Sequence, residues 1–558
     1  MKIKSRRNFL KISSIAGVGI FAGCYKNQKF DIIIKNGTVF DGLNNPGQKV
    51  DLGIVGDKIQ KIGDLSAFTA KTEIDARDLY VSPGFIDIHS HTDIEILVNP
   101  KAESKIRQGI TTDVSGNCGD SPFPLNKNDA EEMAESAKSK YGVDANWNHI
   151  TGFFSQIVKQ GLGINYATFT GHGDLRAFVV GRQDLKPSIE QIEKMKSVLE
   201  QSMKNGSLGL STGLEYSPSN YAKTDELIEL CKVVKKYNGV YATHMRSEDD
   251  KVEEAIVEAI KIAKETGVSL QISHFKACNK SNWHKVDNML KLVHDAKTDG
   301  VDILVDRYPY NAWGTGLSSF LPLWARQGNT DDILARLKNP GEAVKIKNYM
   351  KNRIQLIGGW NRIMISSCNL EQNKKWQGKY IDEAARQSGQ EATQFIFELL
   401  ASERNKVGVI GFAMDEGNLK KVLADPLTMI GSDGTAAAPY GKLHKGNPHP
   451  RYYGTFPRVL GKYCREEKLF NWEIAIMKMT SMPARKLRLK HRGEINTGFF
   501  ADITIFNPNT VIDKATFINP HQYPEGIGYV ILNGKVVIQN GIHTNVLNGR
   551  LLKLENKY

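Results

Sequence analysis

Cysteine is scarce in this chain, which has only six among 558 residues. Cys24 lies directly after an N-terminal apolar segment, and the others show no paired spacing, so a disulfide framework is not expected. Low-complexity segments are also missing. With 41% hydrophobic residues, the chain can bury one large catalytic domain and a smaller companion. The remaining cysteines are Cys118, Cys231, Cys278, Cys368 and Cys464.

A clustered basic surface is not indicated, although the formal net charge is +13. Elsewhere in the chain Lys and Arg alternate with Asp and Glu along expected helices, as in residues 253–264, which is typical of a solvated surface. Nucleic-acid binding is therefore not expected. Part of the excess charge belongs to the N-terminal leader, in Lys2, Lys4, Arg6, Arg7 and Lys11.

The N-terminus has the order of an export signal. Ser5-Arg6-Arg7-Asn8-Phe9-Leu10-Lys11 precedes an apolar run from Ile12 to Ala22, followed by Gly23-Cys24. This order is typical of a twin-arginine signal with a lipoprotein cleavage site, and it predicts a signal over residues 1–24. We expect export to the periplasm and a lipid anchor on Cys24. An uncleaved membrane anchor is the alternative, because Phe21 is unusual three places before such a cysteine.

Short β-rich runs with turn signals occupy both ends of the chain. Residues 25–80 predict part of a small antiparallel sheet, with turns at Asn36-Gly37 and Gly56-Asp57. Residues 491–558 show the same pattern of short β-rich runs and turns, and Asn533-Gly534 predicts a hairpin. We expect the two ends to build one small β-sandwich domain.

Eight apolar runs recur between these ends, and most are followed by a helical pattern. This alternation predicts an α/β fold, a (β/α)₈ TIM barrel over residues 81–490. The stretch 311–427 is too long for one ordinary connection, so it predicts an insertion over the barrel mouth. The runs are Tyr80 to His91, Thr111 to Cys118, Ile164 to His172, Gly206 to Leu214, Val240 to His244, Val268 to His274, Val301 to Tyr308 and Leu427 to Asp433.

Reactive residues stand at the carboxyl ends of these runs, where barrel enzymes carry their catalytic groups. His89 and His91 lie two apart on an extended run, so both imidazoles share a face and can bind one cation. Cys118 is either a metal ligand or a buried thiol, and Asp433 is either a catalytic or a loop-stabilising carboxylate. His172 is either close to a metal ligand or simply packed. The other run ends carry His244 and His274.

Several motifs resemble known families. Ser82-Pro83-Gly84-Phe85-Ile86-Asp87-Ile88-His89-Ser90-His91 resembles the first-strand motif of the amidohydrolase superfamily. The likeness to the N-acyl-D-amino-acid deacylase (D-aminoacylase) family extends from Phe30 to Leu552. It is carried by Gly116-Asn117-Cys118-Gly119, Ser211-Thr212-Gly213-Leu214-Glu215-Tyr216, Thr243-His244-Met245-Arg246-Ser247-Glu248, Gln271-Ile272-Ser273-His274, Gly431-Ser432-Asp433-Gly434 and His449-Pro450-Arg451-Tyr452-Tyr453-Gly454-Thr455-Phe456-Pro457-Arg458.

The resemblance implies a zinc centre. In D-aminoacylases a cysteine takes the place that a carbamylated lysine has in many superfamily members, and here that cysteine is Cys118. A thiolate and imidazoles are ligands that suit zinc. The implied ligands are Cys118, His244 and His274 for one tight zinc ion, and His89 and His91 for a second, weaker site with Asp433 nearby.

The implied reaction is hydrolysis of an N-acyl-D-amino acid to a carboxylate and a free D-amino acid. Zinc would polarise the carbonyl and activate water, while Asp433 would take the water proton and return it to the leaving amine. Lys276 shares a strand face with His274 and is implied to bind the substrate carboxylate. A tyrosine of the segment from Tyr308 to Tyr310 is implied to help it, and Arg451 to bind a second acidic group.

Two other functions are compatible with parts of this sequence. One is another amidohydrolase, dihydroorotase-like or dipeptidase-like, which acts on a cyclic or linear amide. The lack of an assignable bridging lysine argues against it. The other is a non-catalytic lipoprotein that binds a ligand, but such a protein would be expected to have lost a metal ligand or the base, and all the candidates are present.

Overall fold

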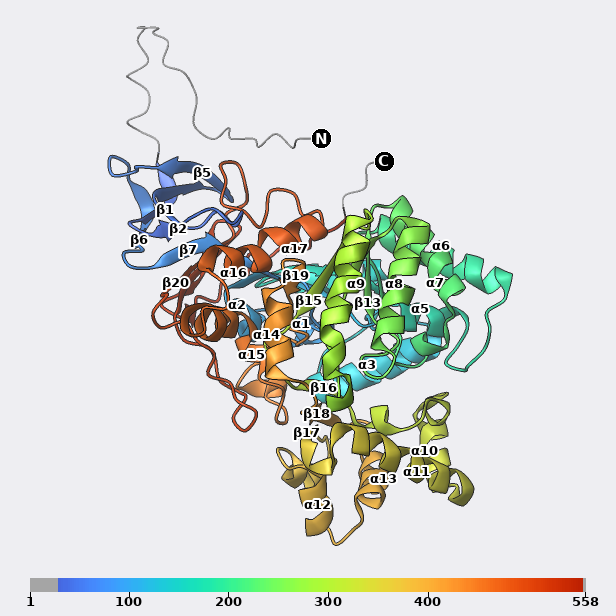
Figure 1. The fold of residues 1–558 in the computed structure, drawn as a ribbon. Helices are drawn as coiled ribbons and strands as arrows, with labels where there is room; N and C mark the ends of the chain where they lie inside the picture. The colour runs from blue at the N-terminus through green and yellow to red at the C-terminus, as the bar shows by residue number, and fades with distance from the viewer. Residues whose placement is uncertain (1–28, 555–558) are drawn as a thin grey trace.

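The computed structural model describes residues 29–554, which form three parts (Figure 1). These are a barrel of strands and helices, a β-sandwich built from both ends of the chain, and an inserted subdomain. The fold class predicted from the sequence is confirmed. The predicted signal, including Cys24, lies outside the described residues. Among the helices of residues 29–554, none has the length and apolarity needed to cross a membrane.

Eight parallel strand positions make up the barrel. β9 pairs with both β8 and β10, and β11, β12, β13, β14, β15 and β19 pair in that order. Phe169 separates β10 from β11 within the third position. A parallel bridge between Ser90 and Gly434 joins the first position to the last and closes the ring. The strands are Phe85–Asp87 (β8), Ile110–Ser115 (β9), Asn165–Thr168 (β10), Thr170–Gly171 (β11), Gly209–Gly213 (β12), Val240–His244 (β13), Ser269–Ile272 (β14), Ile303–Arg307 (β15) and Thr428–Ile430 (β19).

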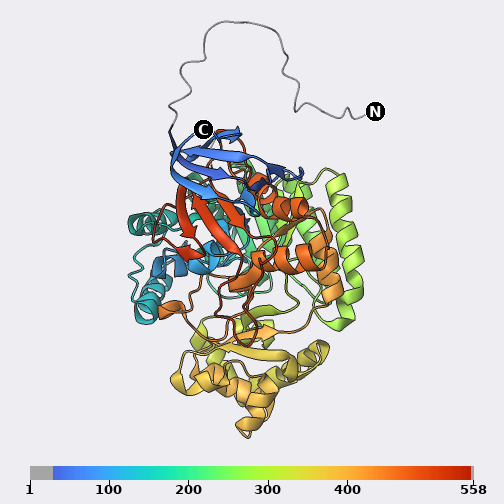
Figure 2. The ribbon, with the colours of Figure 1, turned by 90° about the vertical axis from the view of Figure 1, so that its left-hand side faces the viewer.

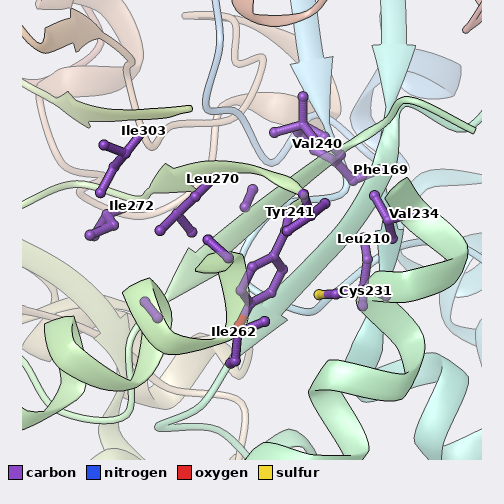
Figure 3. Packing of buried hydrophobic residues seen from close by; sticks show 14 of the residues in the cluster. Phe169, Leu210, Cys231, Val234, Val240, Tyr241, Ile262, Leu270, Ile272 and Ile303 are labelled. Carbon is purple, nitrogen blue, oxygen red and sulfur yellow. The ribbon is translucent and has the colours of Figure 1, made fainter. Parts of the chain in front are cut away.

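Burial on both faces explains why the barrel strands are continuous apolar runs. In Figure 3, Tyr241 of β13 and Leu270 of β14 belong to one buried cluster with Cys231 of α7 and Ile262 of α8. The surrounding helices bury their apolar faces against the strands and leave polar faces in water. They include Lys127–Tyr141 (α3), Ile150–Gln160 (α4), His172–Val179 (α5), Ile189–Lys204 (α6), Thr224–Lys236 (α7), Val252–Thr266 (α8), Val286–Thr298 (α9), Glu416–Ala424 (α14), Trp472–Met479 (α16) and Ser481–Lys486 (α17).

Short helices stand at the mouth of the barrel. Glu95–Val98 (α1) and Glu103–Ile106 (α2) follow the first strand, and Arg451–Arg458 (α15) follows the last. α15 packs against α2, so the chain segments after the first and last strands lie against each other. They bring together residues that are more than 340 positions apart in the sequence, such as Gln108 and Tyr452, which share a hydrogen bond.

The β-sandwich consists of two sheets, in the orders β5-β4-β1-β6 and β23-β22-β21-β20-β7-β2-β3 (Figure 2). Ile32 and Leu52 of one sheet share a core with Ile503 and Ile531 of the other. The hairpin predicted at Asn533-Gly534 is confirmed. The strands are Phe30–Lys35 (β1), Thr38–Val39 (β2), Gln48–Lys49 (β3), Asp51–Val55 (β4), Lys58–Gly63 (β5), Ala70–Asp75 (β6), Tyr80–Pro83 (β7), Ile503–Phe506 (β20), Ile527–Leu532 (β21), Lys535–Gln539 (β22) and Ile542–His543 (β23).

The expectation of a purely antiparallel sheet is wrong at two strand pairs. β1 pairs with β6 in parallel, and β2 pairs with β7 in parallel. The physical reason for the first is that residues 64–69 cross from β5 at one edge of the sheet to β6 at the other. Such a crossover leaves β6 running in the same direction as β1.

The inserted subdomain has a sheet and a core of its own. β18 lies between β16 and β17, and both pairs are antiparallel. Phe320, Ile346 and Ile396 belong to its buried cluster, so the subdomain is packed rather than an open loop. It lies at the bottom of Figures 1 and 2, opposite the β-sandwich. Its elements are Trp313–Gly316 (β16), Thr330–Lys338 (α10), Pro340–Ile357 (α11), Ile363–Ser367 (β17), Ile381–Gln387 (α12), Ala392–Ser402 (α13) and Gly408–Gly411 (β18).

Candidate metal centre

Two groups of metal-binding side chains meet at the barrel mouth, and both contain Cys118. Within each group the candidate ligand atoms all lie within 4.8 Å of one another. The Cys118 Sγ lies 3.3 Å from His89 Nε2 and 3.4 Å from His274 Nε2. His244 Nδ1 lies 2.9 Å from His274 Nε2. The first group is His89, His91, Cys118 and Asp433, and the second is Cys118, His244 and His274.

Three of these residues have a left-handed backbone conformation. The φ angles are +53° at Cys118, +34° at His274 and +49° at Asp433. Non-glycine residues seldom adopt positive φ, which costs of order 1–3 kcal/mol where the conformation is sparsely populated and is found preferentially at functional sites. Each of the three stands two or three residues beyond the end of a barrel strand, after β9, β14 and β19 respectively. The strained turns aim the side chains toward a common point.

Buried charges in the cluster compensate one another. Burial alone would raise the pKa of the Cys118 thiol, but the charges of His89 and His274 lower it well below its usual value. Burial also opposes protonation of His91, yet its hydrogen bonds with Asp433 and Cys118 raise its pKa to about 10. A thiolate next to imidazoles is the form in which cysteine binds metals.

Carboxylates lie behind three of the imidazoles, on the side away from the cluster. Asp306 Oδ1 lies 3.1 Å from His89 Nδ1, and Glu248 Oε1 lies 2.8 Å from His274 Nδ1. Glu215 Oε2 lies 3.7 Å from His244 Nε2. Such outer carboxylates fix the tautomer and orientation of metal-binding histidines. The sequence prediction missed these roles. Glu215 and Glu248 stand inside the quoted motifs, and Asp306 is a carboxylate within an apolar run.

Asp433 joins the cluster to a cation. Its Oδ1 lies 3.0 Å from His91 Nε2, and its Oδ2 lies 2.7 Å from Arg451 Nη1. Burial alone would raise the pKa of this carboxyl, but Arg451, together with His274 and the hydrogen bond with His91, lowers it well below its usual range. Asp433 is therefore a carboxylate at neutral pH.

A buried lysine holds the turn that carries Asp433. The Lys105 Nζ donates to the Ser432 hydroxyl at 2.8 Å and to the Gly434 carbonyl at 3.0 Å. It also forms a fully buried ion pair with Asp87 at 2.7 Å. Asp87 in turn accepts from the backbone N–H of Ser432 at 2.8 Å. Asp87 of the first strand and Lys105 of α2 therefore fix the loop that follows the last strand.

The structure separates the two tyrosines that were predicted to bind substrate. The Arg451 guanidinium lies over the Tyr308 ring, 4.8 Å from its centroid, and the Tyr308 hydroxyl has no hydrogen-bond partner among residues 29–554. The Tyr310 hydroxyl instead donates to Asp513 at 3.2 Å. Lys276 Nζ pairs with Glu248 and lies 2.9 Å from His274 Nδ1. Tyr308 is thus the tyrosine that lies beside Arg451.

His172 lies outside both metal-binding groups. Its Nδ1 lies 2.6 Å from the Ser219 hydroxyl, and its Nε2 lies 3.1 Å from Glu226. Arg176 donates to the same Glu226 oxygen at 3.1 Å. All of these side chains are buried. His172 therefore anchors the loop after β12, which carries Glu215 and Tyr216 to the ring of His244.

The donor set fits a transition-metal ion. One sulfur, four imidazoles and one carboxylate converge on two overlapping groups, with the sulfur in both. Sulfur and imidazole are the ligands that zinc prefers, and a thiolate is favoured by the positive charge around Cys118. The residues present are thus suited to hold one ion at each group.

Curated relatives match almost the whole chain. A D-aminoacylase from Alcaligenes xylosoxydans xylosoxydans is 35% identical over 526 residues, which cover 94% of this chain and 98% of that protein. The chain belongs to the D-aminoacylase family. An N-acyl-D-glutamate deacylase from the same organism is 33% identical over 91% of this chain and 94% of that protein. A model described as the amidohydrolase family matches residues 343–538.

Solved structures of this family have the same fold. A D-aminoacylase structure that addresses the role of a binuclear metal centre has a TM-score of 0.79 and 34% identity, covering 94% of this chain and all of that one. An N-acyl-D-glutamate deacylase from Bordetella bronchiseptica, complexed with zinc and a phosphonate inhibitor, has a TM-score of 0.79 and 31% identity over the same shares. The resemblance predicted from the motifs is confirmed, and the chain is a metal-dependent amidohydrolase.

Proposed function

We propose that this chain hydrolyses the amide bond of N-acyl-D-amino acids, releasing a carboxylate and a free D-amino acid, at a zinc centre. The observation that carries the proposal is the convergence of two metal-binding groups on Cys118, with Asp433 at their edge. The two relatives that match almost the whole chain are named for deacylation of D-amino acids, which supports this substrate class.

Cys118, His244 and His274 would hold the tighter zinc ion, and His89 and His91, with Asp433 nearby, would hold a second, weaker one. Bound zinc supplies a Lewis acid that polarises the scissile carbonyl and lowers the pKa of water. Asp306 and Glu248 keep His89 and His274 in the orientations that this task needs.

Asp433 is proposed to move the proton. Its carboxylate is ionised and lies at the edge of the metal-binding groups, so it can accept a proton from the attacking water. Because its pKa is low, the protonated form then gives that proton readily to the nitrogen of the leaving amine. Arg451 holds the carboxylate in place through its contact with Oδ2.

Recognition of the D-amino acid is proposed to rest on its carboxylate. Tyr308 offers an unpartnered hydroxyl, and Arg451 lies against its ring. Lys276 supplies a second cation on the same side of the metal centre, held there by Glu248. We assign Tyr308 rather than Tyr310 to this role, because the Tyr310 hydroxyl is occupied by Asp513.

A panel of N-acetyl-D-amino acids and their L-isomers, assayed with zinc-loaded protein, tests this function. We expect release of free amino acid from D-substrates and a kcat/KM for the L-isomers lower by at least about 100-fold, or about 2.7 kcal/mol. Exclusive hydrolysis of L-substrates would overturn the assignment. Failure to hydrolyse any member of the panel would also overturn it.

We further propose that the protein is exported by a twin-arginine signal to the periplasm and is anchored by a lipid on Cys24. Ser5 to Lys11 and the following apolar run support this. Twin-arginine export carries folded proteins, which suits an enzyme that binds its metal before it leaves the cytoplasm.

A further inference from the structure

The residues proposed to bind the amino-acid part of the substrate occupy only one side of the barrel mouth. Lys276 follows β14, Tyr308 follows β15, and Arg451 lies beyond β19. The metal-binding groups lie at the centre. The scissile amide must lie over the metal, so its acyl part must extend toward the loops after the other strands.

A groove of about 660 Å³ lies on that other side. Its walls come from the segments that follow β8, β9, β11 and β12, including residues of α1 and α5, and from the inserted subdomain. Helix α3 forms another wall, through residues spaced three and four apart that share one helix face, such as Met133, Ser136 and Lys140. In Figure 1, α3 lies between the barrel strands and the inserted subdomain.

The groove comes near the metal centre at Tyr216. This tyrosine lines the groove, and its ring centroid lies 4.7 Å from that of the candidate ligand His244. Asp120 also lines the groove, two residues after Cys118. A molecule in the groove can therefore have one end against the tyrosine that packs on His244.

The lining of the groove is mixed in charge and polarity. Asp174 and Glu95 line it from the barrel, and Arg326 and Thr315 line it from the inserted subdomain. Each of these residues also has a partner within the protein, and an apolar acyl chain would displace water from their remaining polar surface without replacing its hydrogen bonds, which costs free energy. Pockets of 300–1,000 Å³ hold molecules of drug size, so a single acetyl group would fill little of this one.

We propose that this groove binds the acyl part of the substrate and that this part is a short peptide rather than an acetyl or a fatty acyl group. The inference rests on the proposed deacylase function. Peptide N–H and carbonyl groups alternate along such an acyl chain and match the mixed donors and acceptors of the groove. The reaction remains a hydrolysis: the C–N bond breaks, the carbonyl carbon gains hydroxyl, and the amine nitrogen gains a proton.

Three substrates with the same D-residue, taken as the best from the N-acetyl panel, test the inference. They carry an N-acetyl group, an N-octanoyl group or an L-Ala-L-Ala acyl group. We expect kcat/KM for the peptidyl substrate to exceed both others by at least about tenfold, because remote binding energy adds to transition-state stabilisation. Equal values, or a preference for octanoyl, would overturn the proposal.

A matched pair of variants on α3 locates the effect. Ser136 lines the groove, whereas Ser139 is exposed on the same helix and does not line it. Ser136→Trp should lower the ratio of peptidyl to acetyl kcat/KM by about tenfold, since the indole fills part of the groove. Ser139→Trp should leave the ratio unchanged. An unchanged ratio in Ser136→Trp would contradict the proposed location.

The two proposals can fail separately. If no N-acyl-D-amino acid is hydrolysed, the deacylase function is wrong. If N-acetyl-D-substrates are hydrolysed without any advantage for the peptidyl substrate, the deacylase function stands and the peptide groove is wrong. Circular dichroism of both tryptophan variants checks that they are folded.

Discussion

Arg451 and Asp433 form a buried ion pair, with Nη1 2.7 Å from Oδ2. The other oxygen of the same carboxylate lies 3.0 Å from His91. One side chain therefore connects the cation that lies against Tyr308 with a candidate metal ligand. A substitution of Arg451 or of His91 is therefore expected to alter the contact that Asp433 makes with the other of these two residues.

Asp433→Asn should lower kcat by about 10²–10⁴-fold, because the amide cannot accept the water proton. Zinc bound at Cys118, His244 and His274 should be retained, as measured by elemental analysis. Near-normal turnover by a zinc-loaded variant would show that another group moves the proton.

Cys118→Ser should weaken zinc binding by more than about 100-fold, since the loss of outer partners alone costs 10–100-fold. Activity should fall in parallel and should not return when zinc is added at concentrations that load the unaltered protein. Cys231→Ser is the control, because Cys231 is also buried but lies in the hydrophobic core. Equal zinc affinity in the two variants would remove Cys118 from the metal centre.

Lys105→Met should destabilise the fold by about 3–5 kcal/mol, the usual cost of leaving a buried ion-pair partner alone. Asp87 and Asp113 would lose their buried cation. Chemical denaturation measures the effect, and Lys71→Met serves as the comparison. Lys71 forms an exposed ion pair with Asp31, which is worth at most about 1 kcal/mol. A similar loss in both variants would contradict the role of Lys105.

The stability contribution of Lys478 should rise with pH in the alkaline range. Burial lowers its pKa to about 8, whereas an unfolded lysine titrates near 10.5. Between these values the unfolded state binds more protons, so the free energy of unfolding increases with pH. Relative to Lys478→Met, the unaltered protein should gain about 3 kcal/mol from pH 8 to pH 10.5. Parallel stability curves for the two proteins would contradict the shift.

Cys24→Ala should release the protein from the membrane fraction, because the proposed lipid has no other attachment point. Fractionation of cells that express the full chain, with immunoblotting, measures this. Cys464→Ala is the control, since Cys464 is buried within the fold. Continued membrane association of Cys24→Ala would favour an uncleaved anchor.

The strands and the reactive ends of the barrel could be predicted because parallel strands buried on both faces are short apolar runs. Asp306 could not be assigned a role in this way, since only its neighbours across the barrel show that it faces His89. Tyr308 and Tyr310 are two residues apart and would share a face in a continuing strand. Because β15 ends at Arg307, this alternation does not predict which tyrosine faces the site. The fold of the inserted subdomain could not be predicted, because it depends on a core of its own whose residues follow no repeated pattern in the sequence.

The bridge between Ser90 and Gly434 is the seam of the barrel. His89 and His91 flank one side of this seam, and Asp433 stands next to its other side. The candidate site is therefore incomplete in any chain that lacks the segment after β15, even where the other barrel strands are present.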